Sequence, residues 1–184
     1  MGTEQENAKN RWKRANVSYE NYQDFISKKE DRFKLTLIDL LYISNFIGGN
    51  ATVSESESEV NKKLIFYSER LQEIDKEFQQ KKLSELIDAE INTLIEKVKK
   101  ICDLTNQKAE SHIKGFSITN LSALLSSYFS DLIPILNERV LVSLKIPFEK
   151  DKTKNYSLLI KKIAKQAQNE PKTLREIDCE LYII

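Results

Sequence analysis

The sequence predicts a predominantly all-α protein, a bundle of about five to seven helices in which the longest helices carry a heptad pattern. Residues 50–114 contain neither glycine nor proline, the two residues that most often interrupt helices. Apolar residues recur three and four positions apart through most of the chain, which is the spacing of one helix face. We expect residues 1–136 to form a helical bundle and residues 137–184 a C-terminal segment packed on the same domain.

The first helical block spans residues 3–47. Ser27 followed by Glu30 matches a capping box that would restart a helix there. This block is therefore either one long helix or two helices with a break near residues 27–31, and Gly48–Gly49 are expected to end it. Its helical stripe consists of Trp12, Tyr19, Tyr22, Ile26, Phe33, Leu37, Leu40 and Leu41.

The next helix has a clear N-terminal signal. Ser54, Ser56 and Ser58 are candidate N-caps, and the pairs Ser54/Glu57 and Ser56/Glu59 have the capping-box spacing. The apolar residues that follow alternate spacings of four and three, as in a heptad repeat. We call them the 60–78 seam: Val60, Leu64, Tyr67, Leu71, Ile74 and Phe78.

The heptad register fails after Phe78, because its continuation would place Lys81 and Glu85 on the seam. A second apolar stripe then runs from Ile87 to Ile101. Two structures explain this change of heptad register. One is an antiparallel hairpin with a turn at residues 79–84 and Ser84 as the new N-cap. The other is a continuous helix whose apolar residues move to a different face. The turn residues include no glycine, proline or asparagine, which favours the continuous helix.

The remainder of the chain gives a mixed pattern. Residues 118–133 are apolar on most sides, as in a buried helix, and Pro134 is expected to kink or end it. Residues 156–168 predict an amphipathic helix. Residues 140–146 and 177–183 alternate with a period of two, which permits a small two-stranded element near the C-terminus. Two isolated strands are marginally stable, so we favour helices throughout.

Composition excludes several classes of chemistry. The net charge is +1, and the chain has one histidine and only two cysteines, Cys102 and Cys179, far apart in sequence. Neither a metal-binding spacing nor a nucleophile with an adjacent base is present, so we expect no metal, no cofactor and no catalytic residues. The polar N-terminus and unpaired cysteines predict a cytoplasmic protein, and the apolar stretches are too short to predict a membrane span.

Two carboxylates lie within apolar helical runs, Asp39 in TLIDLLYI and Asp131 in YFSDLIPI. Each belongs either to the exposed stripe of its helix or to a pocket that raises its pKa. The exposed position is the commoner arrangement, and it is the one that we expect for both.

Basic residues form two clusters. Four cations surround one tryptophan near the N-terminus, a combination that can hold phosphates while the indole stacks on a base. Its members are Lys9, Arg11, Trp12, Lys13 and Arg14. The second cluster lies within residues 150–165 and includes Lys161, Lys162 and Lys165. Both clusters are also compatible with ordinary solvated helix faces.

These patterns favour a non-enzymatic protein–protein interaction module, an adaptor or regulatory subunit that uses helix faces. A protein partner or a second copy would bind the 60–78 seam, although the same seam also fits packing within one bundle. The alternative is a nucleic-acid-binding module that uses residues 9–14 and 150–165. A third hypothesis is an enzyme that works through carboxylates near Asp39 or Asp131. No membrane partner is expected.

Overall fold

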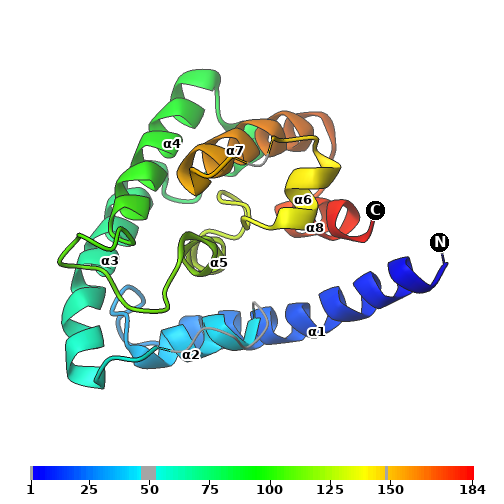
Figure 1. The fold of residues 1–184 in the computed structure, drawn as a ribbon. Helices are drawn as coiled ribbons and strands as arrows, with labels where there is room; N and C mark the ends of the chain where they lie inside the picture. The colour runs from blue at the N-terminus through cyan, green and yellow to red at the C-terminus, as the bar shows by residue number, and fades with distance from the viewer. Residues whose placement is uncertain (1, 47–52, 148) are drawn as a thin grey trace.

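The computed structural model describes residues 2–46, 53–147 and 149–184, and within these ranges it contains helices and no strand (Figure 1). The all-α prediction is therefore confirmed. The described residues form eight α-helices and one short 3₁₀ helix: α1 Gly2–Ser27, α2 Leu37–Phe46, α3 Glu57–Phe78, η1 Leu83–Glu85, α4 Asp88–Asp103, α5 Ile118–Tyr128, α6 Glu138–Ser143, α7 Lys152–Asn169 and α8 Leu174–Ile183.

Helix α5 is the central element of the fold. Figure 1 shows it nearly end-on, with α1 and α2 below it, α3 and α4 to one side, and α7 above. Every residue from Asn120 to Tyr128 is buried, as predicted for this segment. The helix starts at the N-cap Ser117, whose hydroxyl accepts from the Asn120 N–H. It ends at Tyr128, before Pro134, and the chain continues through the core in a non-helical conformation.

The first block consists of two helices separated by residues 28–36. Ser27 does not cap a new helix, because its hydroxyl donates to the carbonyl of Asp24 at 2.7 Å. Aromatic rings join the two helices, with Tyr19 5.3 Å from Phe46 and Tyr22 5.3 Å from Tyr42 between ring centroids. The expected stop at Gly48–Gly49 lies outside the described residues.

Helices α3 and α4 are separate, so the favoured continuous helix is wrong. The chain leaves α3 at Gln79, which has a positive φ of 46°. Two contacts place the helices antiparallel: Lys97 Nζ lies 3.3 Å from Glu77, and the Tyr67 hydroxyl donates to the Leu104 carbonyl at 3.0 Å. Ser84 does not cap α4, whose first turn is instead closed by Glu90 accepting from the Ile87 N–H at 3.1 Å.

The two segments with a period of two fall in helices, so the described residues contain no C-terminal strand pair. Residues 140–146 belong to α6 and the turn after it, and 177–183 belong to α8. The buried residues of α8 are Leu174, Ile177 and Leu181, which are spaced by three and four. The amphipathic helix predicted over residues 156–168 is confirmed as part of α7.

One hydrophobic core joins both ends of the chain, with buried members from Tyr19 to Leu181. Residues 137–184 pack on the preceding helices: the buried Tyr156 hydroxyl donates to the Pro134 carbonyl at 2.9 Å, and Gln168 donates to the Leu86 carbonyl at 2.8 Å. In the part of the chain that the structure describes, no helix combines the length and the apolar character needed to cross a membrane.

Candidate functional site

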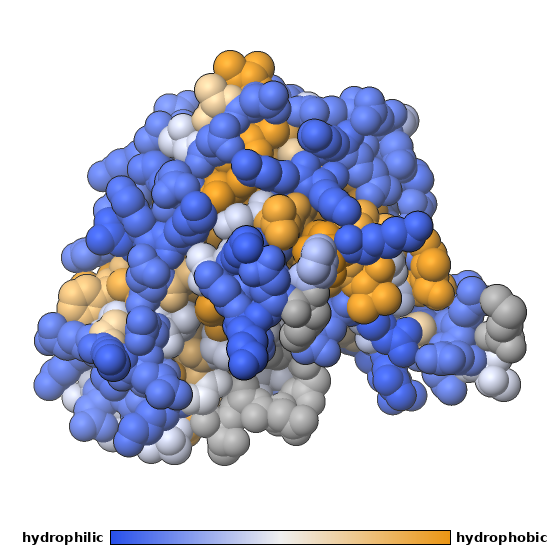
Figure 2. All heavy atoms as spheres, turned by 45° about the horizontal axis from the view of Figure 1, so that its top comes forward, coloured by the Kyte–Doolittle hydropathy of each residue, from blue (hydrophilic) through white to orange (hydrophobic). Residues whose placement is uncertain are grey.

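A groove of about 590 Å³ lies between α1 and the C-terminal helices, and we call it the α1–α8 groove. Its lining comes mainly from α1, α6, α8 and residues 135–137, while α2, α5 and α7 contribute one residue or two each. The volume is within the usual range for ligand pockets. In Figure 1 the N-terminal part of α1 projects from the body beneath α6 and α8, and Figure 2 shows hydrophobic atoms gathered on this side of the molecule.

Positive charge dominates the lining of the groove. Four of the chain's six arginines and one lysine line it, against two acidic side chains. The cations are Arg11, Arg14, Arg139, Lys152 and Arg175, and the acids are Glu138 and Asp178. Within the described part of the chain, the side chains of Arg11, Arg14 and Lys152 form no ion pair. The groove therefore has uncompensated cations available for an anionic ligand.

Apolar side chains share the same lining. They come from four helices and the segment before α6, and they include Trp12, Ala15, Phe46, Ile135, Leu136, Leu141 and Tyr182. A ligand that fills the groove would therefore meet both cations and apolar surface.

Arg175 is the most tightly held of these cations. Its guanidinium carbon lies 4.6 Å from the centroid of the Trp12 ring and 4.8 Å from that of Tyr19. Its Nε donates to Asn16 at 2.9 Å, and its Nη1 donates to Asp178 at 2.6 Å. These contacts fix α8 against α1.

Asp178 receives a second hydrogen bond from α1, because the Trp12 indole N–H donates to the same carboxylate oxygen at 3.4 Å. Burial raises the pKa of Asp178, while the Arg175 charge and the Trp12 hydrogen bond act in the opposite direction. Trp12, Arg175 and Asp178 thus form one connected group at the groove.

Arg139 closes the groove toward the start of α1. It lies 3.9 Å from Glu4, in an exposed ion pair, and its guanidinium carbon is 5.5 Å from the centroid of the Tyr182 ring. An exposed pair of this kind contributes little stability, so Arg139 can turn toward a ligand at small cost.

The structure separates the sequence-predicted basic residues into two surfaces. Of the N-terminal cluster, Arg11, Trp12 and Arg14 line the groove, whereas Lys9 and Lys13 are exposed outside its lining. The α7 lysines, Lys161, Lys162 and Lys165, are exposed and do not line the groove. Lys162 is held by the α6–α7 connection, donating to the Leu144 carbonyl at 2.6 Å.

All six residues of the 60–78 seam are buried inside the chain, with exposures of 2% or less. The Tyr67 hydroxyl lies within hydrogen-bond distance of the carbonyls of Leu104 and Ser111. In this conformation Val60, Leu64, Tyr67, Leu71, Ile74 and Phe78 form part of the hydrophobic core, so the surface that a partner would meet lies elsewhere. The apolar seam reflects packing of α3 within the bundle.

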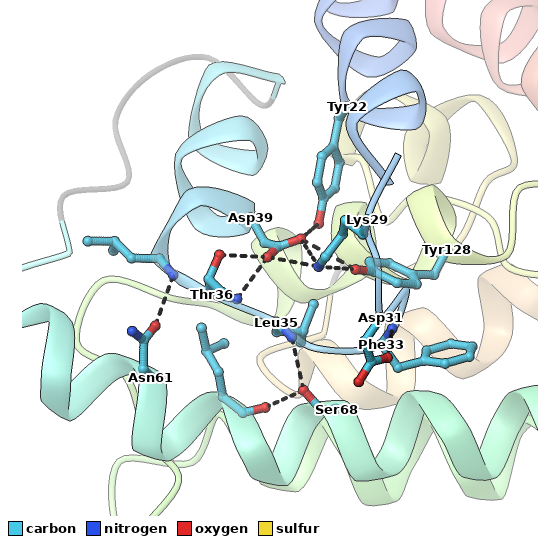
Figure 3. Close-up of polar contacts among 12 residues, drawn as sticks. Tyr22, Lys29, Asp31, Phe33, Leu35, Thr36, Asp39, Asn61, Ser68 and Tyr128 are labelled. Carbon is cyan, nitrogen blue, oxygen red and sulfur yellow. Dashed lines mark hydrogen bonds and ion pairs between the residues drawn. The ribbon is translucent and has the colours of Figure 1, made fainter. Parts of the chain in front are cut away.

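Asp39 is fully buried, so the expectation that it lies on an exposed stripe is wrong. Figure 3 shows its carboxylate between α1, α2 and α5. It accepts hydrogen bonds from Lys29 at 2.9 Å, Tyr22 at 2.9 Å and Tyr128 at 3.3 Å through one oxygen. The other oxygen accepts from the Thr36 N–H at 2.8 Å and from the Thr36 hydroxyl at 3.2 Å.

This buried network is saturated by protein donors. Burial raises the pKa of Tyr22 and of Tyr128, and the nearby Asp39 charge raises both further. Both tyrosines therefore remain protonated donors to the carboxylate. Asp39 lines neither the α1–α8 groove nor the second cavity described below, so its arrangement suits joining helices and not acid–base chemistry on a substrate.

Asp131 is half-buried and lines a second cavity of about 560 Å³ beside η1 and the connection between α7 and α8. The lining of this cavity is mostly polar, and its Lys172 is paired with Glu170 and with Glu180, each at 2.8 Å. These two ion pairs compensate the positive charge of Lys172.

The remaining candidates for chemistry are isolated. Burial raises the pKa of the Cys102 thiol to about 12, which disfavours the reactive thiolate. His112 lies with its Nδ1 3.0 Å from the Thr105 carbonyl. Among the described residues, no group of three or more His, Cys, Asp and Glu side chains is arranged to hold a metal ion.

Arg139 and Arg175 are not among the residues that the sequence predicts for a site, because they are far from residues 11–14 along the chain. One signal was available: arginine is rare here, and lysine is the common cation. A scarce arginine placed beside aromatic and apolar residues is a better candidate for planar anion recognition than an abundant surface lysine.

Searches with models of known protein families, among curated proteins and among solved structures find no match to this chain.

Proposed function

We propose that the chain is a non-enzymatic protein interaction module whose α1–α8 groove binds an acidic segment of a partner protein. The observation that supports the proposal is the lining of the groove, where Arg11, Arg14 and Lys152 lack ion-pair partners within the described structure. Charges of this kind attract an oppositely charged partner and orient it on approach. The hydrophobic part of the lining supplies the contact area that charges alone do not.

A protein segment fits this surface better than a nucleic acid does. Binding to a phosphate backbone benefits from a continuous basic track, whereas Lys161, Lys162 and Lys165 lie outside the lining that contains Arg11 and Arg14. The net charge of the whole chain is only +1. An acidic segment with apolar side chains would use both kinds of lining residue at once.

The test is affinity capture with the immobilised chain in extract with and without nuclease treatment, comparing the wild type with two charge-reversal variants. Arg11→Glu/Arg14→Glu changes the groove, and Lys161→Glu/Lys162→Glu makes the matched change on α7. All four side chains are exposed, so both variants are expected to fold. We expect a stoichiometric protein partner whose recovery falls at least about tenfold with the groove variant, because two attractive charges become repulsive.

Retention of that partner by Arg11→Glu/Arg14→Glu at the wild-type level would refute the groove as its binding site. The captured partner must also bind through an acidic segment, which overlapping peptides would locate. Recovery that requires nucleic acid and is lost with Lys161→Glu/Lys162→Glu would support the nucleic-acid alternative in its place.

A further inference from the structure

Arg175, a residue that lines the α1–α8 groove, has one donor without an acceptor among the described residues. Nη2 of Arg175 is buried from solvent and has no hydrogen-bond partner among the described residues. It is the one buried side-chain nitrogen or oxygen in that part of the chain without such a partner. Buried polar groups are almost always satisfied, and an exception often marks a missing water, ion or ligand.

The rest of the guanidinium is held in place. Asn16 and Asp178 accept from Nε and Nη1, and the rings of Trp12 and Tyr19 lie within 5 Å of the guanidinium carbon. Nη2 therefore cannot reach another protein acceptor without breaking these contacts. A guanidinium fixed in this way is pre-organised for a planar acceptor, so little side-chain entropy is lost on binding.

The neighbouring charges specify the chemistry of the missing acceptor. Asp178 compensates one positive charge, while Arg11 and Arg14 on the facing helix have no ion-pair partner in the described structure. A neutral acceptor would satisfy Nη2 and leave these charges uncompensated. An anionic oxygen acceptor satisfies both requirements, and on an acidic protein segment that acceptor is a carboxylate.

We propose that Arg175 is the specificity-determining residue of the groove and that its Nη2 donates to a side-chain carboxylate of the bound acidic segment. This inference rests on the proposed function and adds the contact that selects the ligand. Arg11 and Arg14 attract the segment, whereas Arg175 fixes its position.

The first experiment needs no variant. Trp12 is the single tryptophan of the chain, so its indole N–H gives one unambiguous NMR resonance, and Trp12 shares the Asp178 carboxylate with Arg175. The ¹⁵N-labelled protein is titrated with N-acetylglutamate amide, with its neutral isostere N-acetylglutamine amide, and with inorganic phosphate. We expect the indole resonance to move progressively with millimolar N-acetylglutamate amide and to stay in place with the other two.

No movement of the indole resonance with N-acetylglutamate amide would overturn the proposal, because Nη2 would then not bind a carboxylate. An equal or larger response to phosphate would also overturn it, because the site would then recognise phosphate.

The second experiment compares two charge-preserving substitutions in binding to the captured partner. Arg175→Lys removes the planar fork, and Arg70→Lys makes the same change outside the groove, at a residue of α3 that is paired with Glu73. We expect Arg175→Lys to weaken binding at least about tenfold and Arg70→Lys to change it less than about threefold. Thermal unfolding of each variant shows whether it remains folded.

The two proposals fail in different ways. If Arg11→Glu/Arg14→Glu abolishes capture but Arg175→Lys binds like the wild type, the groove is the site and Arg175 does not select its ligand. If neither change affects capture, the proposed function itself is refuted.

Discussion

At the residue scale, the charged groups of Asp39 and Arg175 differ in how many of their polar atoms have hydrogen-bond partners. The Asp39 carboxylate accepts hydrogen bonds on both oxygens and is paired with Lys29. Nη2 of Arg175 has no acceptor among the residues that the structure describes. A saturated buried charge stabilises a particular arrangement of helices, whereas an unsatisfied one is a candidate for recognition.

The Lys29–Asp39 pair leads to a prediction about stability. Lys29→Met leaves Asp39 buried without its compensating charge, and the free energy of unfolding is expected to fall by about 3–5 kcal/mol. Lys28→Met is the matched control, because Lys28 is adjacent and its ion pair with Asp24 is largely exposed. Urea denaturation at neutral pH measures both variants. Equal stability of the two would show that the buried pair contributes no more than a surface pair.

At the element scale, helix ends explain where the bundle changes direction. Ser56 is the N-cap of α3, and Glu59 accepts from the Ser56 N–H at 3.3 Å to complete the capping box. Thr173 is the N-cap of α8, and its N–H donates to the Glu176 carboxylate at 2.8 Å to complete a second capping box. Each box satisfies backbone N–H groups that a helix start otherwise leaves unpaired.

The cap of α3 can be tested against its neighbour in sequence. Ser56→Ala removes the acceptor for the Glu59 N–H and is expected to lower the free energy of unfolding by about 1 kcal/mol. Ser58→Ala is the control, since Ser58 is exposed within the first turn of the same helix. Chemical denaturation distinguishes the two variants. A larger loss with Ser58→Ala would show that the helix starts at a different residue.

At the scale of the whole molecule, Glu55 connects α3 to the segment before α5. Its carboxylate is paired with Lys63 of α3 and accepts from the Lys114 N–H at 2.6 Å. Burial acts to raise the pKa of Glu55, but the hydrogen bonds from Lys63 and Lys114 outweigh it, and the pKa lies below its ordinary value.

This lowered pKa makes the contribution of Glu55 dependent on pH. The folded protein holds the ionised carboxylate more strongly than the unfolded chain does, so the contribution is complete above the unfolded pKa of about 4.3 and is lost as pH falls through the folded pKa. Glu55→Gln is expected to be about 1–2 kcal/mol less stable than the wild type at pH 7.

Denaturation across a pH series would measure how this difference shrinks in acid. Glu57→Gln, at an exposed position two residues away, is the control. A stability difference that persisted unchanged well below pH 4 would show that the ionised carboxylate is not the source of the effect.

Local patterns predicted much of this fold. The buried helix that starts at Ile118, the amphipathic helix at 156–168 and the cap at Ser56 each depend on residues close in sequence, although the first of these ends at Tyr128 and not at residue 133. The break between α3 and α4 after Phe78 does not depend only on residues close in sequence. It is stabilised where the Leu83 N–H donates to the Asp131 carbonyl at 2.8 Å, a contact between distant residues that no local pattern encodes.

The candidate site was predictable only in part, for the same reason. Arg11, Trp12 and Arg14 stand together in the sequence and were recognised as a cluster. Arg139 and Arg175 join them only because α6 and α8 pack beside α1. Short helices such as α6 also carry too few residues to distinguish a period of two from a period of 3.6.

The packing of the last helix against the first also bears on how the chain is made. Trp12 contacts Asp178, a partner 166 residues away, so α1 cannot complete its contacts until α8 has left the ribosome. Contacts between residues so distant in sequence slow folding and keep apolar surface exposed in the meantime. During synthesis, the aromatic face of α1 would therefore be a binding surface for chaperones before it becomes a wall of the groove.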